Sequence, residues 1–171
     1  MRKCYRAERF RAVTKGLRYR VAMHADPVIE QVTSVTDALV SAYEKLLPQL
    51  SETAPLDRDS LAEIVGSPTT VILVATEGGQ ILGMCTLATF RIPSGVRSWI
   101  DDVVVDEQAR GRGIASALVN AAVALAASAG ARSVDLTSRP EREAANRLYL
   151  QLGFERRETN VYRRIVDPPR S

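Results

Sequence analysis

Two glycines and two arginines alternate in a short segment between two apolar stretches. The segment is Gln108-Ala109-Arg110-Gly111-Arg112-Gly113-Ile114-Ala115. Gly111 and Gly113 let the backbone bend and approach a ligand closely. Unpaired N–H groups at the start of the next helix point at the same spot, and the helix dipole adds positive potential there. The segment therefore predicts an anion site that suits a pyrophosphate, with Arg110 and Arg112 adding charge.

Two other phosphate-binding patterns do not fit this segment. A Rossmann motif requires a glycine where this chain has Ser116, and a Walker motif requires Gly-Lys-Ser/Thr, which is absent. A tight turn between a strand and a helix explains the two glycines equally well when they are taken alone. The interpretation therefore depends on the elements on either side.

Those elements are predicted to be a buried strand and a long helix. Ser98–Val105 ends in three consecutive valines, as expected of a strand that is covered on both faces. Gly111–Ala129 carries alanine and leucine at helical spacing. Ser133–Thr137 is predicted to be the next strand, and the capping-box pattern of Ser138–Glu141 starts another helix. A strand–helix–strand order implies a right-handed crossover between parallel strands.

The rest of the chain predicts antiparallel strands and two more helices. The expected strands are 27–32, 70–75, 81–92 and a C-terminal pair at 154–158 and 161–165, and the expected helices are 36–47 and 59–65. Turns such as Glu77–Gln80 join neighbouring strands in antiparallel hairpins. The predicted fold class is therefore α/β (α+β), with a single mixed, mostly antiparallel sheet and helices on both faces.

Two motifs resemble the GNAT superfamily of N-acetyltransferases. Gln108-x-x-Gly111-x-Gly113, placed between the valines and an alanine- and leucine-rich helix, resembles the pyrophosphate motif of that superfamily. Ala145-Asn146-Arg147-Leu148-Tyr149 with Leu152-Gly153-Phe154 resembles its second conserved helix. The resemblance covers residues 27–165. It implies the acyl-CoA N-acyltransferase fold, in which a central pair of parallel strands splays apart.

The resemblance also implies acetyl-CoA as the cosubstrate, and it indicates where that molecule binds. The pantetheine arm would lie along the splayed strand, at the backbone of Val103, Val104 and Val105. The phosphates would bind at Arg110, Gly111, Arg112, Gly113, Ile114 and Ala115, and the second helix would add Asn146 and Tyr149. The implied activity is transfer of an acetyl group to a primary amine of a small molecule or peptide, by direct attack in a ternary complex.

Acetyl transfer to an amine needs a proton acceptor and a proton donor, because an ammonium group cannot attack a thioester and the departing thiolate needs a proton. Tyr149 is the leading candidate for the acid, since it shares a helix edge with Asn146 and similar proteins place a tyrosine there near the sulfur. Asp101 and Asp102 are candidates for the base or for holding the amine. Adjacent strand residues face opposite sides, so only one of the two would face the acetyl group unless a bulge intervenes.

The N-terminus suggests other functions. The first 20 residues hold eight basic residues and one acidic residue, a net charge of +7 in a chain whose net charge is +3. We expect residues 1–24 to be a flexible basic extension and residues 25–171 to be one N-acetyltransferase domain. The alternative functions are nucleic-acid binding through the basic arm and a non-catalytic acyl-CoA-binding regulatory module.

The sequence also gives expectations about partners and location. No cysteine, histidine and carboxylate cluster has metal-ligand spacing, so no metal is expected. No apolar segment spans a bilayer comfortably, and two cysteines make a reducing compartment, the cytoplasm, the default location. A homodimer is expected from base rates alone. The acceptor amine is left open, because loops 48–57 and 91–97, which should shape its pocket, carry no readable specificity.

Overall fold

A mixed sheet organises the first of the two units into which the chain divides, Met1–Thr137 and Ser138–Ser171. The structure is a computed structural model that describes residues 18–19, 27–50 and 57–166. The expected basic extension, residues 1–24, lies outside the described residues apart from a two-residue strand at 18–19.

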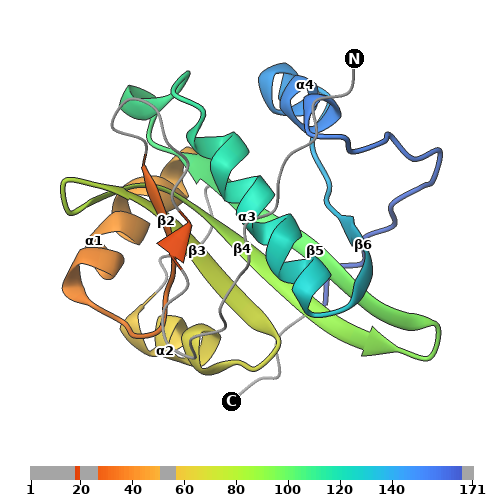
Figure 1. Cartoon of the computed structure of the whole chain (residues 1–171), viewed down its shortest axis with the longest axis horizontal. Coiled ribbons are helices and arrows are strands. Elements are labelled where there is room, and N and C mark those ends of the chain that lie inside the picture. Colours follow the sequence, from red (N-terminus) through yellow and green to blue (C-terminus); the bar gives the residue numbers. More distant parts are fainter. Residues whose placement is uncertain (1–17, 20–26, 51–56, 167–171) are drawn as a thin grey trace. The chain divides into compact units, whose positions relative to one another are not determined.

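The strands of the described sheet follow one another in chain order. They are β1 Arg18–Tyr19, β2 Val28–Gln31, β3 Thr70–Glu77, β4 Gln80–Ile92, β5 Gly95–Val105 and β6 Ala131–Asp135. Neighbours from β1 to β5 pair antiparallel, whereas β5 and β6 pair parallel. The predicted fold class, with one mixed and mostly antiparallel sheet, is therefore confirmed (Figure 1).

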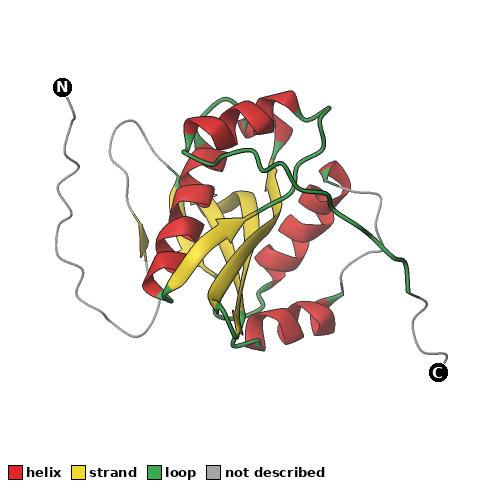
Figure 2. Ribbon diagram, turned by 90° about the vertical axis from the view of Figure 1, so that its right-hand side faces the viewer, coloured by secondary structure: helices red, strands yellow, loops and turns green. Residues whose placement is uncertain are grey.

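Helices cover both faces of this sheet (Figure 2). The helix α1 Asp37–Leu46, the 3-10 turn η1 Leu47–Gln49 and the helix α2 Arg58–Gly66 lie on one face, and α3 Ile114–Ser128 lies on the other. Thr36 caps α1 by accepting a hydrogen bond from the N–H of Leu39 at 3.1 Å. Asp57 caps α2 in the same way, accepting from the N–H of Ser60 at 2.7 Å.

Each face of the sheet has its own apolar core. The core under α1 and α2 consists of Leu39, Ala42, Tyr43, Leu46, Leu61, Ile72, Val74, Met84 and Val104. On the other face, α3 buries Ile114, Leu118, Val119, Ala121, Ala122 and Ala126. The small alanine side chains let α3 lie close to the strands, so β4 and β5 are covered on both faces, as the three valines predict. Among the described residues, no helix has both the length and the apolar character that crossing a membrane requires.

The second unit contains the helix α4, Glu143–Gln151, whose start differs from the prediction. Ser138–Glu141 do not cap it, since the residue before the helix is Arg142 and no side chain accepts from the first turn. Instead, the side-chain amide of Asn146 donates to the carbonyl oxygens of Arg139 at 2.9 Å and Pro140 at 3.4 Å. A side chain within the helix therefore holds the turn that precedes it.

The predicted C-terminal strand pair is wrong. Residues 154–166 follow α4 without forming a strand, and the apolar side chains of Val161, Tyr162 and Ile165 are exposed. Alternating apolar residues form a strand only where a partner supplies the hydrogen bonds of the ladder. Because no such pair is present, β6 is the last strand of the described sheet, and the parallel pair β5–β6 lies at its end.

The structure predicts that Gly83 in β4 cannot carry a side chain. An added Cβ would lie 2.9 Å from the carbonyl oxygen of Val104 and 3.2 Å from side-chain atoms of Ile114 and Val105. We therefore expect Gly83→Ala to lower the free energy of unfolding by about 1–3 kcal/mol, the usual cost of overpacking. Urea denaturation followed by circular dichroism measures this.

The matched control is Gly66→Ala at the end of α2, where nothing lies within 4 Å of the new Cβ. That variant should be as stable as the wild type or slightly more so, because alanine favours a helix. Equal urea midpoints for the two variants would contradict the packing argument.

Candidate functional site

β5 and β6 form a fork. They pair at Val96–Ala131, at Ser98–Val134 and at Trp99–Asp135, and their pairing stops there. On its other edge, β5 remains paired with β4 as far as Val105. The N–H and C=O groups of a strand point alternately to its two sides, so part of those on Ile100–Val105 face the open fork without a strand partner. The expected splay of the parallel pair is therefore present, and the predicted Val103, Val104 and Val105 lie along it.

A β-bulge lies in β5 just where the fork opens. Asp101 pairs with Thr86 and Val104 pairs with Met84, so Asp102 and Val103 together oppose the single residue between those two on β4. Asp102 has a φ of 51°, in the left-handed region that residues other than glycine seldom adopt. The strict alternation of side chains is broken at this point, so the two adjacent aspartates need not face opposite sides of the sheet.

Asp101 and Asp102 lie close together at the bulge. Asp101 shares the face of Thr86, its partner across the strands, which is the face covered by α1 and α2. Its Oδ1 accepts a hydrogen bond from the N–H of Asp102 at 3.0 Å. Partial desolvation raises the pKa of the Asp102 carboxyl, and the neighbouring charge of Asp101 raises it further. A carboxylate with a raised pKa is a stronger base, a property that suits Asp102 to accepting a proton.

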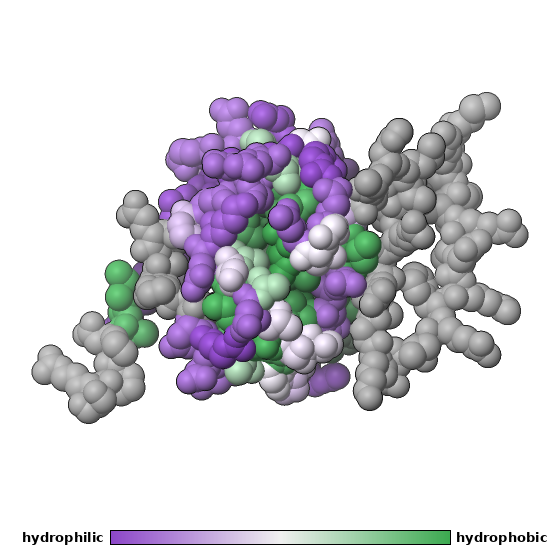
Figure 3. Space-filling view, turned by 90° about the vertical axis from the view of Figure 1, so that its left-hand side faces the viewer, coloured by the Kyte–Doolittle hydropathy of each residue, from purple (hydrophilic) through white to green (hydrophobic). Residues whose placement is uncertain are grey.

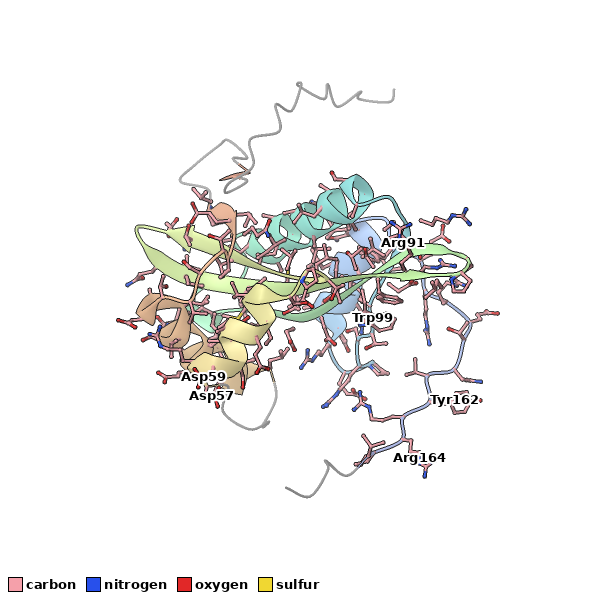
Figure 4. The ribbon with its side chains drawn as sticks, turned by 90° about the horizontal axis from the view of Figure 1, so that it is seen from below. Asp57, Asp59, Arg91, Trp99, Tyr162 and Arg164 are labelled. Atoms are coloured by element: carbon pink, nitrogen blue, oxygen red, sulfur yellow. The ribbon has the colours of Figure 1, made fainter. Side chains whose placement is uncertain are left out.

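The α1–α2 side of the fork also carries Trp99. Its cross-strand partner is Ala88, two residues from Thr86, so Trp99 and Asp101 share a face of the sheet. Figure 4 shows Trp99 on the same side of the sheet as α2, whose first residues include Asp59. Residues 91–97, expected to be a loop, are instead the end of the long β4–β5 hairpin, with Pro93 and Ser94 in its turn. Residues 51–56 of the other expected loop lie outside the described part of the chain.

The start of α3 is open and uncapped, three residues later than predicted. Gly111 and Gly113 have φ values of 77° and 78°, in the region that glycine alone adopts freely. The first helical hydrogen bond runs from the N–H of Ala117 to the carbonyl oxygen of Gly113. No side chain caps the N–H groups that precede it, and the first turn has no acidic residue. Backbone donors and the positive end of the helix dipole are therefore uncapped at Gly111–Ala115, where the sequence predicts an anion site; the anion site itself stays a prediction.

The two arginines of this segment contact other protein groups. Arg110 donates to the carbonyl oxygen of Val105 and to Oε1 of Gln49, each at 3.4 Å. Arg112 forms an ion pair at 2.5 Å with Glu77, the last residue of β3. The arginines therefore hold the loop in place, and the N–H groups at the helix start have no side-chain cap.

A buried carboxylate ties this loop to α1. Asp106, 3% exposed, forms an ion pair with Lys45 of α1 and accepts from the N–H of Gln108 at 3.1 Å. The hydrogen bond from Lys45 is the main reason that the pKa of Asp106 lies below its usual value. Gln49 of η1 accepts from the N–H of Glu107 at 3.1 Å. The helix beside the aspartates is thus fixed to the loop that precedes α3.

The two remaining predicted residues, Asn146 and Tyr149, lie on α4 in the second unit. The Asn146 amide holds the turn before α4, as described above. Tyr149 stacks edge-on against Phe154, with ring centroids 5.9 Å apart. Asn146 and Tyr149 are three residues apart in α4, so they lie on the same side of this helix, as the sequence predicts.

Sequence reasoning missed several residues around the site. Lys45, Gln49 and Glu77 come from segments far from the glycine motif in sequence, and nothing in their local pattern indicates that they contact it. Cys85 is a buried free cysteine, and burial raises the pKa of its thiol to about 12. Among the described residues, no group of three or more histidine, cysteine and carboxylate side chains is placed to hold a metal ion.

A separate pocket lies between β2, the start of α1 and the β3–β4 turn. It is lined by Glu30, Gln31, Val32, Ser34, Thr36, Ala38, Leu39, Val74, Thr76, Gly79 and Ile81. Figure 3 shows hydrophobic residues gathered in the middle of one face of the molecule and framed by hydrophilic ones. None of the predicted site residues lines this pocket, so it is distinct from the fork.

Comparison with known sequences identifies related proteins. A model of the acetyltransferase (GNAT) family matches residues 33–154. An uncharacterized N-acetyltransferase of Methanocaldococcus jannaschii is 42% identical over 59 residues, which make up 34% of this chain and 26% of that protein. The match therefore spans about a quarter of the length of that relative.

Solved structures resemble the chain over more of its length. A Trypanosoma brucei acetyltransferase superposes with a TM-score of 0.66 at 27% identity, covering 80% of this chain and 99% of that one. An aminoglycoside N-acetyltransferase in complex with CoA has a TM-score of 0.69 at 20% identity, covering 85% and 99% of the two chains. The second likeness is one of fold alone.

The Glu77–Arg112 pair predicts that Glu77 weakens anion binding at the loop. Both side chains are partly exposed, and Glu77 places a negative charge beside the helix start. We expect Glu77→Gln to tighten CoA binding roughly two- to fivefold at low salt, the scale of one exposed ion pair, and the gain should shrink at high salt. Isothermal titration calorimetry at two salt concentrations measures this.

Asp37→Asn is the matched control, because it breaks another exposed pair, with Arg58, at the start of α1. Its CoA affinity should equal that of the wild type. Weaker binding by the Glu77 variant would show that the pair organises the loop for binding instead.

Proposed function

Since it belongs to the acetyltransferase (GNAT) family, we propose that this chain transfers an acetyl group from acetyl-CoA to a primary amine of a small molecule or peptide. The amine would attack directly, in a ternary complex. The observation that carries the proposal is the fork between β5 and β6, with an uncapped helix start beyond one end and two carboxylates at the other.

The fork and the helix start suit acetyl-CoA as the cosubstrate. The pantetheine arm carries amide groups, and the unpaired backbone of Val103, Val104 and Val105 offers them hydrogen bonds in the manner of an added strand. The backbone donors of Gly111, Gly113, Ile114 and Ala115 suit the phosphates, and Arg110 and Arg112 hold that loop. Acetyl-CoA supplies an acetyl group activated as a thioester, and no metal is needed in this scheme.

The carboxylates at the bulge would prepare the amine. Asp102, whose pKa is raised, would accept the proton that an ammonium group must lose before its nitrogen can attack. Asp101, which lies beside it at the bulge, would hold the incoming amine. Backbone N–H groups at the fork would stabilise the negative charge that develops on the carbonyl oxygen.

Tyr149 would supply the proton that the departing thiolate takes up, and Asn146 would accompany it on α4. These roles rest on the resemblance of the helix sequence and on the family match, which extends to residue 154. The phenol of tyrosine has a pKa of about 10, so it is protonated and able to donate at neutral pH.

The acceptor would be a small-molecule or peptide amine. Trp99 and the two aspartates on the α1–α2 side of the fork offer an aromatic surface and negative charge, both of which favour a cationic amine. A solved structure that shares the fold is an aminoglycoside N-acetyltransferase by name. We further propose that the reaction takes place in the cytoplasm, and that the chain acts as a homodimer without nucleic acid.

Acetyl-CoA should stabilise the fold. At about a hundred times its Kd, a ligand that binds only the native state adds about 2.7 kcal/mol, which raises the melting temperature of a chain of this size by roughly 5–10 °C. Differential scanning fluorimetry with acetyl-CoA, followed by a thiol-release assay over a panel of amines, measures both parts of the proposal. No thermal shift with either acetyl-CoA or CoA would count against it.

Gly113→Val tests the position of the phosphates within the same assay. Because φ is 78° at this position, a β-branched residue is strained there, and CoA binding should weaken roughly tenfold. Gly130→Val is the matched control, since Gly130 has the same φ but ends α3 far from the loop. Equal CoA affinities in the two variants would place the phosphates elsewhere.

Tyr149→Phe should lower kcat without abolishing folding. The ring and its contact with Phe154 are kept, whereas the proton donor is lost, so we expect a loss of roughly 10- to 10⁴-fold in kcat with little change in the KM for acetyl-CoA. Steady-state kinetics with the best amine of the panel measures this. Wild-type turnover, with chemistry as the slow step, would make Tyr149 a packing residue.

A further inference from the structure

The α1–α2 side of the fork carries a tryptophan beside two carboxylates. Trp99 of β5 pairs with Asp135, the last residue of β6, so the side chains of these partners lie on the same face of the sheet. Asp101 shares that face, because it lies two residues further along β5. Two residues of a strand span about 6.7 Å and neighbouring strands are about 4.8 Å apart, so the Cα atoms of Asp101 and Asp135 lie about 8 Å from each other.

Two hydrogen bonds in series hold Asp135 on this face. Nη1 of Arg97 donates to Oγ of Ser133 at 2.8 Å, and this hydroxyl donates to Oδ2 of Asp135 at 3.1 Å. Arg97 lies two residues before Trp99 on β5, so its contact with Ser133 agrees with the shared face. The orientation of the Asp135 carboxylate is therefore fixed from the side of Arg97.

The other side of the Asp135 carboxylate is left without a protein cation. Within the described part of the chain, no lysine or arginine forms an ion pair with Asp135, and Oδ1 accepts no hydrogen bond. The guanidinium of Arg97 contacts Ser133 instead. Asp135 is partly buried, and a carboxylate that is partly removed from water gains from a cationic partner. A ligand can supply that partner.

Trp99 offers a second attraction for the same cation. It is partly exposed and lies outside the apolar core under α1 and α2. Its partner on β4 is the small residue Ala88, and Phe90, 43% exposed, lies two residues further along the same face. A cation over the face of an indole ring is attracted by the charge distribution of that ring. An ammonium group at this position can therefore interact with Trp99 and Asp135 together.

From this arrangement, and resting on the proposed function, we infer that Asp135 determines acceptor specificity by binding a second ammonium group of the acceptor. The reacting amine must lose its proton near Asp101 and Asp102, whereas an amine that does not react keeps its charge at neutral pH. A carboxylate accepts a charged N–H at about 2.8 Å, so one acceptor can reach both positions when its two nitrogens are about 5–8 Å apart. The preferred acceptors are then diamines and polyamines.

The test compares two acceptors of nearly equal size. Putrescine (1,4-diaminobutane) carries the second ammonium group, and 4-amino-1-butanol has a neutral hydroxyl in its place. We expect the kcat/KM of the wild type to be roughly ten- to hundredfold higher for putrescine, the scale of one charged hydrogen bond. In Asp135→Asn this ratio should fall to about threefold or less, mainly through KM, because the second ammonium group takes no part in the reaction.

Two further variants separate a binding role from a structural one. Asp135→Glu keeps the charge and extends it by one methylene, so it should keep the preference for diamines and move it from putrescine toward 1,3-diaminopropane. Asp59→Asn is the matched control, because it removes the same charge from an exposed position on α2 that lies well apart from Trp99 (Figure 4). Its ratio should equal that of the wild type, since water and salt screen a distant surface charge.

Trp99 also reports binding without turnover, because it is the only tryptophan of the chain. With CoA bound, putrescine should change the tryptophan fluorescence of the wild type at roughly tenfold lower concentration than 4-amino-1-butanol does. Asp135→Asn should lose this difference, and Asp135→Glu should keep it. The Glu variant and the wild type decide the question even if Asp135→Asn does not fold.

The outcomes separate this inference from the proposed function. Equal affinities of the wild type for the two acceptors, a preference that survives in Asp135→Asn, or an unchanged choice of diamine in Asp135→Glu would overturn the role of Asp135. Its hydrogen bonds would then serve only to join β6 to β5. If the wild type acetylates no amine of the panel, the proposed function fails, and the fluorescence titration still reports whether a second ammonium group strengthens binding beside Trp99.

Discussion

A strand with two residues opposite one residue of its neighbour must bend, and in this chain the bend falls in β5 at Asp102 and Val103. Beyond Trp99 the strand continues beside β4, whereas its pairing with β6 stops at Asp135, the last residue of β6. Backbone groups that a regular sheet would pair internally are left for a ligand. The open edge, the position of the aspartates and the direction in which the chain enters the glycine-rich turn all follow from that one irregularity.

The charges along the open edge are arranged with opposite sign at its two ends. Asp101 and Asp102 stand where the fork begins, and the uncapped start of α3, whose first turn has no acidic residue, follows where β5 ends. The phosphates of a ligand at the α3 end and a cationic amine at the aspartate end would match this polarity. Arg110 and Arg112 contribute to the arrangement mainly through contacts that fix the turn, with Val105 and with Glu77.

Contacts of α1 and η1 with the loop before α3 connect the aspartate end of the site to the glycine-rich loop. The buried Asp106 is satisfied by Lys45 of α1 and by the backbone of its own turn, and Gln49 adds two more contacts. Removing Lys45 would leave the buried carboxylate of Asp106 without its cation, although Lys45 itself is 59% exposed. The helix α1 and the loop before α3 are thus parts of one framework.

The sequence by itself determined the mixed sheet, the helix pattern, the glycine-rich turn and the family resemblance, because these depend on local periodicity, on positive φ at Gly111 and Gly113, and on short motifs. Tertiary structure alone decided the rest. The bulge at Asp102 depends on register against β4, and the C-terminal segment has a strand-like pattern but no partner strand, so that prediction failed. Lys45 and Glu77 join the site through contacts between residues distant in the chain, and no local pattern encodes the pairing of a side chain with a neighbour that only folding brings near.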